Sequence, residues 1–82
     1  MRYRIELKKR AVKDLRSLEH GVQKRIIAGL EGLQHDLHGD VKRLTNFTPE
    51  YRLRVGDYRV LFEVAEDLIT VYRFTHRRDA YS

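Results

Sequence analysis

The first residues of the chain alternate between polar and apolar side chains, and the pattern then changes to a helical one. Over residues 2–7 every second side chain is apolar, which is typical of a half-buried strand. From Lys8 the apolar side chains recur three or four residues apart, which predicts an amphipathic helix. The apolar positions are Tyr3, Ile5 and Leu7 in the strand, then Ala11, Val12, Leu15 and Leu18 in the helix.

A second amphipathic helix is predicted after Gly21, a glycine in a position where helices often end. Its apolar stripe consists of Val22, Ile26, Ile27, Leu30 and Leu33. The polar stretch that follows, residues 35–50, contains the only proline of the chain. It predicts a loop in which Val41 and Leu44 turn inward.

Three further strands are predicted at residues 51–55, 58–65 and 68–75, each rich in β-branched and aromatic residues. The element order is therefore β-α-α-β-β-β in a single domain, residues 1–82. We expect an α+β fold with a mainly antiparallel four-stranded sheet. The N-terminal strand and the helical hairpin would pack on one face of it.

The dipeptide Gly56-Asp57 predicts a two-residue hairpin, which would place Arg54 opposite Arg59 and Arg52 opposite Leu61. A turn at Glu66-Asp67 would pair Val64 with Ile69, Phe62 with Val71, Leu61 with Tyr72 and Arg59 with Phe74. In this register the core face carries Leu53, Val55, Tyr58, Val60, Phe62, Val64, Ile69 and Val71, with Arg73 near the sheet end. The other face carries Arg52, Arg54, Arg59, Leu61, Glu63, Tyr72, Phe74 and His76.

The arginines of the second face require an explanation, because like charges in directly opposed positions destabilise a sheet. An ordinary solvated surface would explain the alternation alone. Tyr72 and Phe74 beside the arginines favour a site for single-stranded nucleic acid, in which cations hold phosphates and aromatic rings stack on bases. We therefore expect Tyr72, Phe74 and the tail residue Arg78 to contact RNA.

Composition supports a polyanionic partner and limits the other classes of site. The net charge is +5 and the isoelectric point is about 9.8. The chain contains no cysteine, which excludes disulfides and thiolate metal sites and suits a reducing cytoplasm. It also has no apolar run of membrane-spanning length, so we expect a cytoplasmic protein without a membrane partner. His35 and His38 with their neighbouring aspartates do not form a convincing metal site, and we expect no metal or cofactor.

The C-terminal segment adds candidate chemistry at the hairpin end of the sheet. Histidine, here His76, is a residue type that can serve as an acid or base near neutral pH, Tyr81 offers a hydroxyl or a stacking ring, and Arg77 can stabilise a phosphorane-like transition state. Together with the arginine face, these groups suggest metal-independent phosphodiester cleavage. Attack by a ribose 2′-hydroxyl would make RNA the substrate.

The two segments "YRLRVGDYRVLFEV" and "LITVYRFTHRRDAY" resemble the RelE/ParE superfamily of toxins from type II toxin-antitoxin systems, on the RelE side. The resemblance implies a ribosome-dependent mRNA endonuclease, or mRNA interferase, that cuts the codon in the A site and so inhibits translation. It implies that Arg52 and Arg54 are the basic residues of the first hairpin strand and that Arg59 holds the phosphate. Arg77 would stabilise the transition state or leaving group, and Tyr81 would orient the substrate.

The family pattern leaves the general base unassigned in this chain. Some members carry lysines where Arg52 and Arg54 stand, and arginine is a poor base because it stays protonated. The base would be His76 or Tyr81, unless orientation of the 2′-hydroxyl on the ribosome supplies most of the rate.

The resemblance also implies an antitoxin partner, so that the chain would exist as a monomer or as an antitoxin-bound hetero-oligomer. The same fold allows two other functions. One is a ParE-like toxin that inhibits DNA gyrase without cleaving RNA, and the other is an inactive binding module derived from a toxin.

Overall fold

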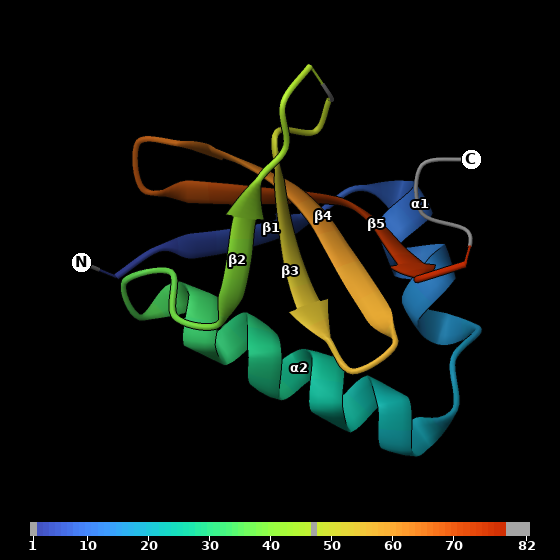
Figure 1. Ribbon diagram of the computed structural model, residues 1–82. Helices are drawn as coiled ribbons and strands as arrows, with labels where there is room; N and C mark the ends of the chain where they lie inside the picture. Colours follow the sequence, from blue (N-terminus) through green and yellow to red (C-terminus); the bar gives the residue numbers. More distant parts are fainter. Residues whose placement is uncertain (1, 47, 79–82) are drawn as a thin grey trace.

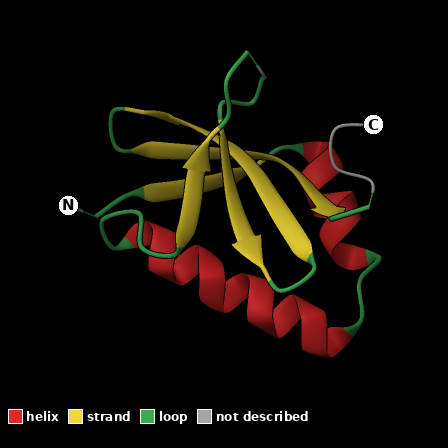
Figure 2. Cartoon of the chain, viewed as in Figure 1, coloured by secondary structure: helices red, strands yellow, loops and turns green. Residues whose placement is uncertain are grey.

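The computed structural model describes residues 2–46 and 48–78, which form one layer of helices against one sheet (Figures 1 and 2). The elements in chain order are β1 (Arg4–Leu7), α1 (Lys9–Arg16), α2 (His20–Gln34), β2 (Asp40–Arg43), β3 (Tyr51–Val55), β4 (Tyr58–Ala65) and β5 (Leu68–His76). The sheet has five strands in the order β1-β5-β4-β3-β2. The pair β1–β5 is parallel and the other pairs are antiparallel, so the predicted α+β fold is confirmed. The N-terminal strand does not pack on a face of the sheet with the helices, as expected, because it is hydrogen-bonded within the sheet as its edge strand beside β5.

The expectation of four strands is wrong by one, because the predicted loop at residues 35–50 contains β2. This strand lies at the sheet edge, and only Val41 is partly buried in it while its other three residues are exposed. So short a segment gives no measurable alternation. Gly39 precedes it with φ +128°, and a Cβ there would lie 2.6 Å from Leu53 Cδ1. Glycine is therefore required where the chain enters β2.

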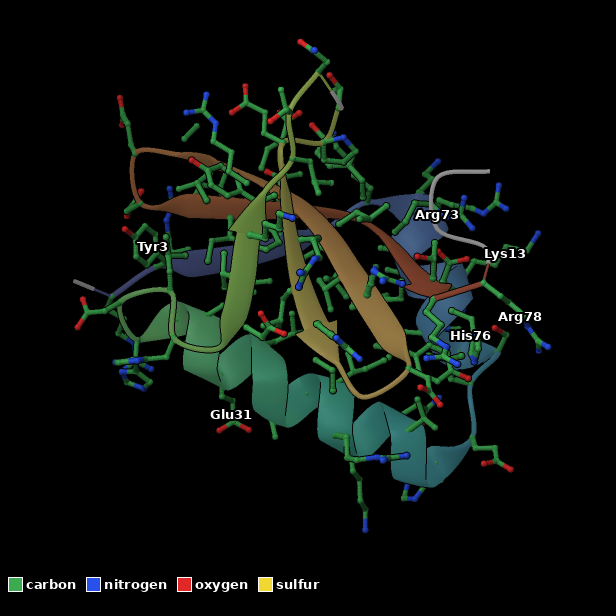
Figure 3. The ribbon with its side chains drawn as sticks, viewed as in Figure 1. Tyr3, Lys13, Glu31, Arg73, His76 and Arg78 are labelled. Atoms are coloured by element: carbon green, nitrogen blue, oxygen red, sulfur yellow. The ribbon has the colours of Figure 1, made fainter. Side chains whose placement is uncertain are left out.

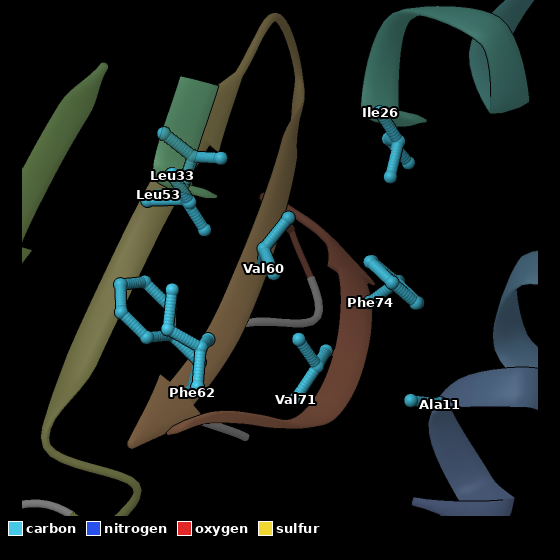
Figure 4. Close-up of a cluster of buried hydrophobic side chains, with 9 residues drawn as sticks. Ala11, Ile26, Leu33, Leu53, Val60, Phe62, Val71 and Phe74 are labelled. Atoms are coloured by element: carbon cyan, nitrogen blue, oxygen red, sulfur yellow. The ribbon is translucent and has the colours of Figure 1, made fainter. Parts of the chain in front are cut away.

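The hydrophobic core lies between the two helices and one face of the sheet (Figure 4). Phe62, at the centre of β4, is fully buried. The buried cluster is Ala11 from α1, Ile26 and Leu33 from α2, and Leu53, Val60, Phe62, Ile69, Val71 and Phe74 from the strands. Full burial of one such large apolar side chain stabilises the fold by about 1.5–3 kcal/mol. Because both helices cover this face, the opposite face of the sheet, called here the outer face, lacks a helical layer among the described residues.

The predicted pairing of β3 with β4 is confirmed, including Arg54 opposite Arg59 and Arg52 opposite Leu61. Between β4 and β5 the register is as expected only from the turn to Phe62 and Val71. A bulge then shifts it, so that Leu61 pairs with Arg73 instead of Tyr72. A β-bulge inserts one residue into a strand and reverses the faces of the residues beyond it.

The bulge corrects three expectations. Phe74 pairs with Val60 and is 3% exposed in the core, so it is not a stacking surface for RNA. Arg73 belongs to the outer face and not to the core side. His76 pairs with Tyr58, on the side of the helices, and not with the arginines.

Helix α1 covers the edge of β5 where that strand extends beyond its partner β1. The register of β1 ends with Leu7 opposite Val71, and Asp14 of α1 lies beside the next residues. Its carboxylate accepts hydrogen bonds from the Phe74 backbone N–H at 3.1 Å and from Arg73 Nε at 2.7 Å and Nη2 at 3.4 Å. Asp14 therefore satisfies a backbone donor that a neighbouring strand would otherwise bind.

Candidate nucleic-acid interface

The basic residues of the outer face form two rows that cross β2, β3, β4 and β5. The strand register defines both rows, because directly paired residues share a face. The first row is Asp40, Arg54, Arg59 and Thr75, and the second is Lys42, Arg52, Leu61 and Arg73. Cations of four neighbouring strands thus gather on the surface that the helices leave uncovered.

Arg52 and Arg54 differ in how firmly they are held. Arg52 Nη1 donates to the Asp40 carbonyl oxygen at 3.0 Å and lies 3.5 Å from Asp40 Oδ1, and its side chain is only 14% exposed. Arg54 is exposed, and its Nε lies 3.5 Å from the Gly56 carbonyl oxygen. Asp40 pairs with Arg54 in the register, so one carboxylate offsets part of the repulsion among the arginines. Arg54 keeps its donors accessible to a ligand.

Arg59 lies at the centre of the first row, between Arg54 of β3 and Thr75 of β5. Its side chain is half-buried, and its Nε and Nη1 atoms are buried. Its guanidinium carries a positive charge and a planar fork of N–H donors. The surrounding protein screens the field of a half-buried charge less than water does.

Arg77 lies at the Gly56-Asp57 turn, as the sequence predicts. Its backbone N–H donates to the Asp57 carbonyl oxygen at 2.7 Å, and its Nε is 3.9 Å from Asp57 Oδ1. Both side chains are mostly exposed, so this ion pair is weak and the guanidinium remains available. Arg78 is also exposed and lies at the same end of the molecule as Arg73 and His76, beside α1 (Figure 3).

The contacts of His76 differ from those of a free acid–base group. Its ring meets the ring of Tyr58 edge-on, with centroids 5.1 Å apart. The Arg78 backbone N–H lies 3.3 Å from His76 Nδ1. A backbone N–H can only donate, so Nδ1 carries the lone pair and Nε2 carries the proton. This contact joins the His76 ring to the segment that carries Arg77 and Arg78.

Tyr72 is half-buried, and Lys8 Nζ lies 5.9 Å from its ring centroid. The cation occupies one face of the ring, which leaves less of it for base stacking. Tyr81 lies outside the described residues. Sequence reasoning missed Lys42, Asp40 and Arg73 as members of the outer face. The first two lie in the unrecognised edge strand, and the bulge displaced the third.

The described residues contain neither a metal-ligand cluster nor a membrane-spanning helix. Among residues 2–46 and 48–78, no three His, Asp or Glu side chains lie close enough to hold a metal ion. No helix of this part of the chain has the length and apolar character needed to span a membrane. The feature with clear chemical character is thus the arginine-rich outer face, which can bind phosphates and stabilise negative charge.

Comparison with known proteins gives consistent matches along the chain. The family model of ParE toxins of type II toxin-antitoxin systems matches residues 5–81. Toxin RelE3 of Methanocaldococcus jannaschii is 37% identical over 75 residues, which cover 85% of each chain.

Two solved structures share both fold and sequence with this chain. One is a RelB–RelE antitoxin–toxin complex from Methanococcus jannaschii, with 34% identity, a TM-score of 0.75 and coverage of 92% of this chain and 93% of that one. The other is an archaeal RelE–RelB complex from Pyrococcus horikoshii, with 30% identity, a TM-score of 0.79 and coverage of 98% and 100%.

Proposed function

The chain belongs to the RelE/ParE toxin family of type II toxin-antitoxin systems, and on this basis we propose that it is a ribosome-dependent endoribonuclease that cleaves mRNA in the A site. The observation that carries the proposal is the arginine cluster at the hairpin end of the outer face. Arg54 and Arg59 are directly opposed, Arg52 is in the next row, and Arg77 is fixed to the turn. Such a cluster fits a phosphate whose charge increases during the reaction.

The proposed reaction needs no metal. The ribose 2′-oxygen attacks the adjacent phosphorus and loses its proton, and the bond to the 5′-oxygen of the next nucleotide breaks. The leaving oxygen takes a proton, and the products are a 2′,3′-cyclic phosphate and a 5′-hydroxyl end. Arg59 and Arg54 would bind the phosphate oxygens, and Arg77 would stabilise the leaving oxygen. Their guanidinium groups donate hydrogen bonds and remain charged throughout.

We assign His76 as a positioning residue and not as the general base. Its unprotonated nitrogen accepts from the Arg78 backbone N–H, which fixes the turn that carries Arg77. Taking up a proton at Nδ1 would break this contact. Of the candidates from the sequence, Tyr81 then remains for the proton transfer, together with orientation of the 2′-hydroxyl by the ribosome.

Two substitutions of His76 separate these roles. His76→Asn puts an amide oxygen near the position of Nδ1 and should retain most of the cleavage rate. His76→Gln extends past that position and should lower the rate at every pH, because the turn loses its acceptor. Single-turnover cleavage measured between pH 5.5 and 9 should keep the same profile in both variants and in the wild type. A pH dependence that disappears in both variants would identify His76 as the base instead.

The partner is proposed from the same comparisons. The RelE structures that match this chain are complexes with RelB antitoxins, and we expect this chain to bind an antitoxin protein as well. A disordered acidic or amphipathic segment that folds on binding would complement the net charge of +5. The chain would act in the cytoplasm, where its second partner, the translating ribosome, is located.

Primer extension on ribosomes programmed with a defined mRNA tests the function directly. Adding the protein should produce a new 3′ end within the A-site codon, and naked mRNA should be cut far less. A DNA supercoiling assay with gyrase serves as the control for the ParE-like alternative. Inhibited supercoiling with intact mRNA would replace the proposal by that alternative. Neither effect, with no growth arrest on expression, would favour an inactive binding module.

A further inference from the structure

We propose that the RNA strand crosses the outer face at right angles to the β-strands, from Lys42 on β2 to Arg73 on β5, and that Lys42 is a phosphate-binding residue. This inference rests on the proposed function and adds the direction of the substrate. It begins from the second row, in which Lys42 pairs with Arg52, Arg52 with Leu61, and Leu61 with Arg73. Three interstrand spacings separate its ends, about 14 Å.

The row beyond the two basic rows has the opposite charge. Glu63 of β4 pairs with Thr70 of β5, and Thr70 pairs with Glu6 of β1. Two residues along a strand span about 7 Å, so the Glu63 carboxylate lies within a Debye length of a phosphate bound beside Leu61 in the second row. A polyanion that ran along the strands from the Gly56-Asp57 turn would meet Glu63 and Glu6. An RNA strand that crosses the β-strands instead passes Lys42, Arg52 and Arg73 and does not run over Glu63 and Glu6.

The two ends of this path have different properties. Lys42 is exposed on the edge strand, and its flexible ammonium group can follow a mobile phosphate. Arg73 is held by Asp14 through Nε and Nη2, and its side chain is 38% exposed. The Asp14 carboxylate neutralises part of the charge of Arg73. Arg73 therefore marks the end of the RNA path at β5 and contributes little to RNA affinity. Lys42 is therefore the residue whose removal reports on the path.

Salt dependence of RNA binding provides the test. Each phosphate contact on single-stranded nucleic acid contributes about 0.7 to the slope of log K against log salt. The Lys42→Ala variant of the full chain should bind a labelled oligoadenylate more weakly than the wild type does. The slope of its salt dependence should be lower in magnitude by about 0.7. Oligouridylate should give the same change, since phosphate contacts do not depend on sequence. Glu63→Gln should bind more tightly, because it removes the repulsion at the border of the path.

Lys24→Ala is the matched control, because Lys24 is an exposed lysine of α2, on the side away from the outer face. It removes the same charge and should leave the slope unchanged. Three results would contradict the proposed RNA path. They are a salt slope of Lys42→Ala equal to that of Lys24→Ala, an unchanged RNA affinity in Glu63→Gln, and no RNA binding at low salt. The binding assay does not depend on cleavage. Binding with the expected slopes but without ribosomal cleavage would therefore remove the proposed function and leave the path in place.

Discussion

Arg59→Ala should reduce ribosome-dependent mRNA cleavage by about 100- to 1000-fold, the loss typical of removing one preorganised donor to a transition-state anion. Arg59 is half-buried at the centre of the first row, between Arg54 and Thr75, and its Nε and Nη1 atoms are buried. In the alanine variant only Arg52 and Arg54 would remain to hold the phosphate. Arg52 is already paired with Asp40, and Arg54 is exposed to solvent. Single-turnover cleavage on programmed ribosomes, followed by primer extension, measures the effect.

Arg59→Lys is the matched variant, because it keeps the charge and removes the planar fork of donors. We expect it to recover only a small part of the rate. Thermal unfolding of all three proteins checks that the loss is not one of folding. A well-folded Arg59→Ala protein with normal cleavage would show that the phosphate binds elsewhere.

Asp14→Ala should lower the free energy of unfolding by about 2–3 kcal/mol, because it leaves the Phe74 N–H and the Arg73 guanidinium without their shared acceptor. The side chain of Asp14 is 14% exposed, so water replaces these contacts only in part. A domain of this size has a total stability of about 4–12 kcal/mol. The midpoint of thermal unfolding should fall by about 10–20 °C.

Two further variants isolate the contact. Arg10 also lies near Asp14, at 3.6 Å, but its side chain is 63% exposed, so Arg10→Ala should change stability by less than about 0.5 kcal/mol. Asp14→Asn keeps an acceptor oxygen and should fall between the wild type and alanine. A double-mutant cycle of Asp14→Ala with Arg73→Met should show coupling. Additive effects would mean that the carboxylate acts on the backbone alone.

The hairpin of β3 and β4 could be predicted from the sequence because its signals are local. Gly56-Asp57 fixes the turn, and the alternation of apolar residues allows only one register, since a slip by one residue would bury Arg54 and Arg59. The order of the helices and strands follows from changes of period in the same way. The position of Arg77 at the turn then follows from the length of β5.

The parts that could not be predicted depend on contacts between distant segments. Nothing near Leu61 signals a bulge, because no glycine or proline lies at residues 68–76 and the apolar pattern there fits either register. The anchor for the shifted register is Asp14, which lies on another element. Strand β2 could not be predicted from its composition, because it forms a strand only through its pairing with β3.

Strand β5 lies between the first strand of the chain and β4, and this position affects the order of folding. β1 is synthesised early, but it pairs only after the whole segment from Arg4 to Leu68 has been made. Contacts so distant in sequence slow folding, because the chain must close a long loop before it gains them. On a translating ribosome, the outer face is therefore completed only when β5, the last described strand, emerges. Under the proposed function, a growing chain would therefore not act on the ribosome that makes it until that moment.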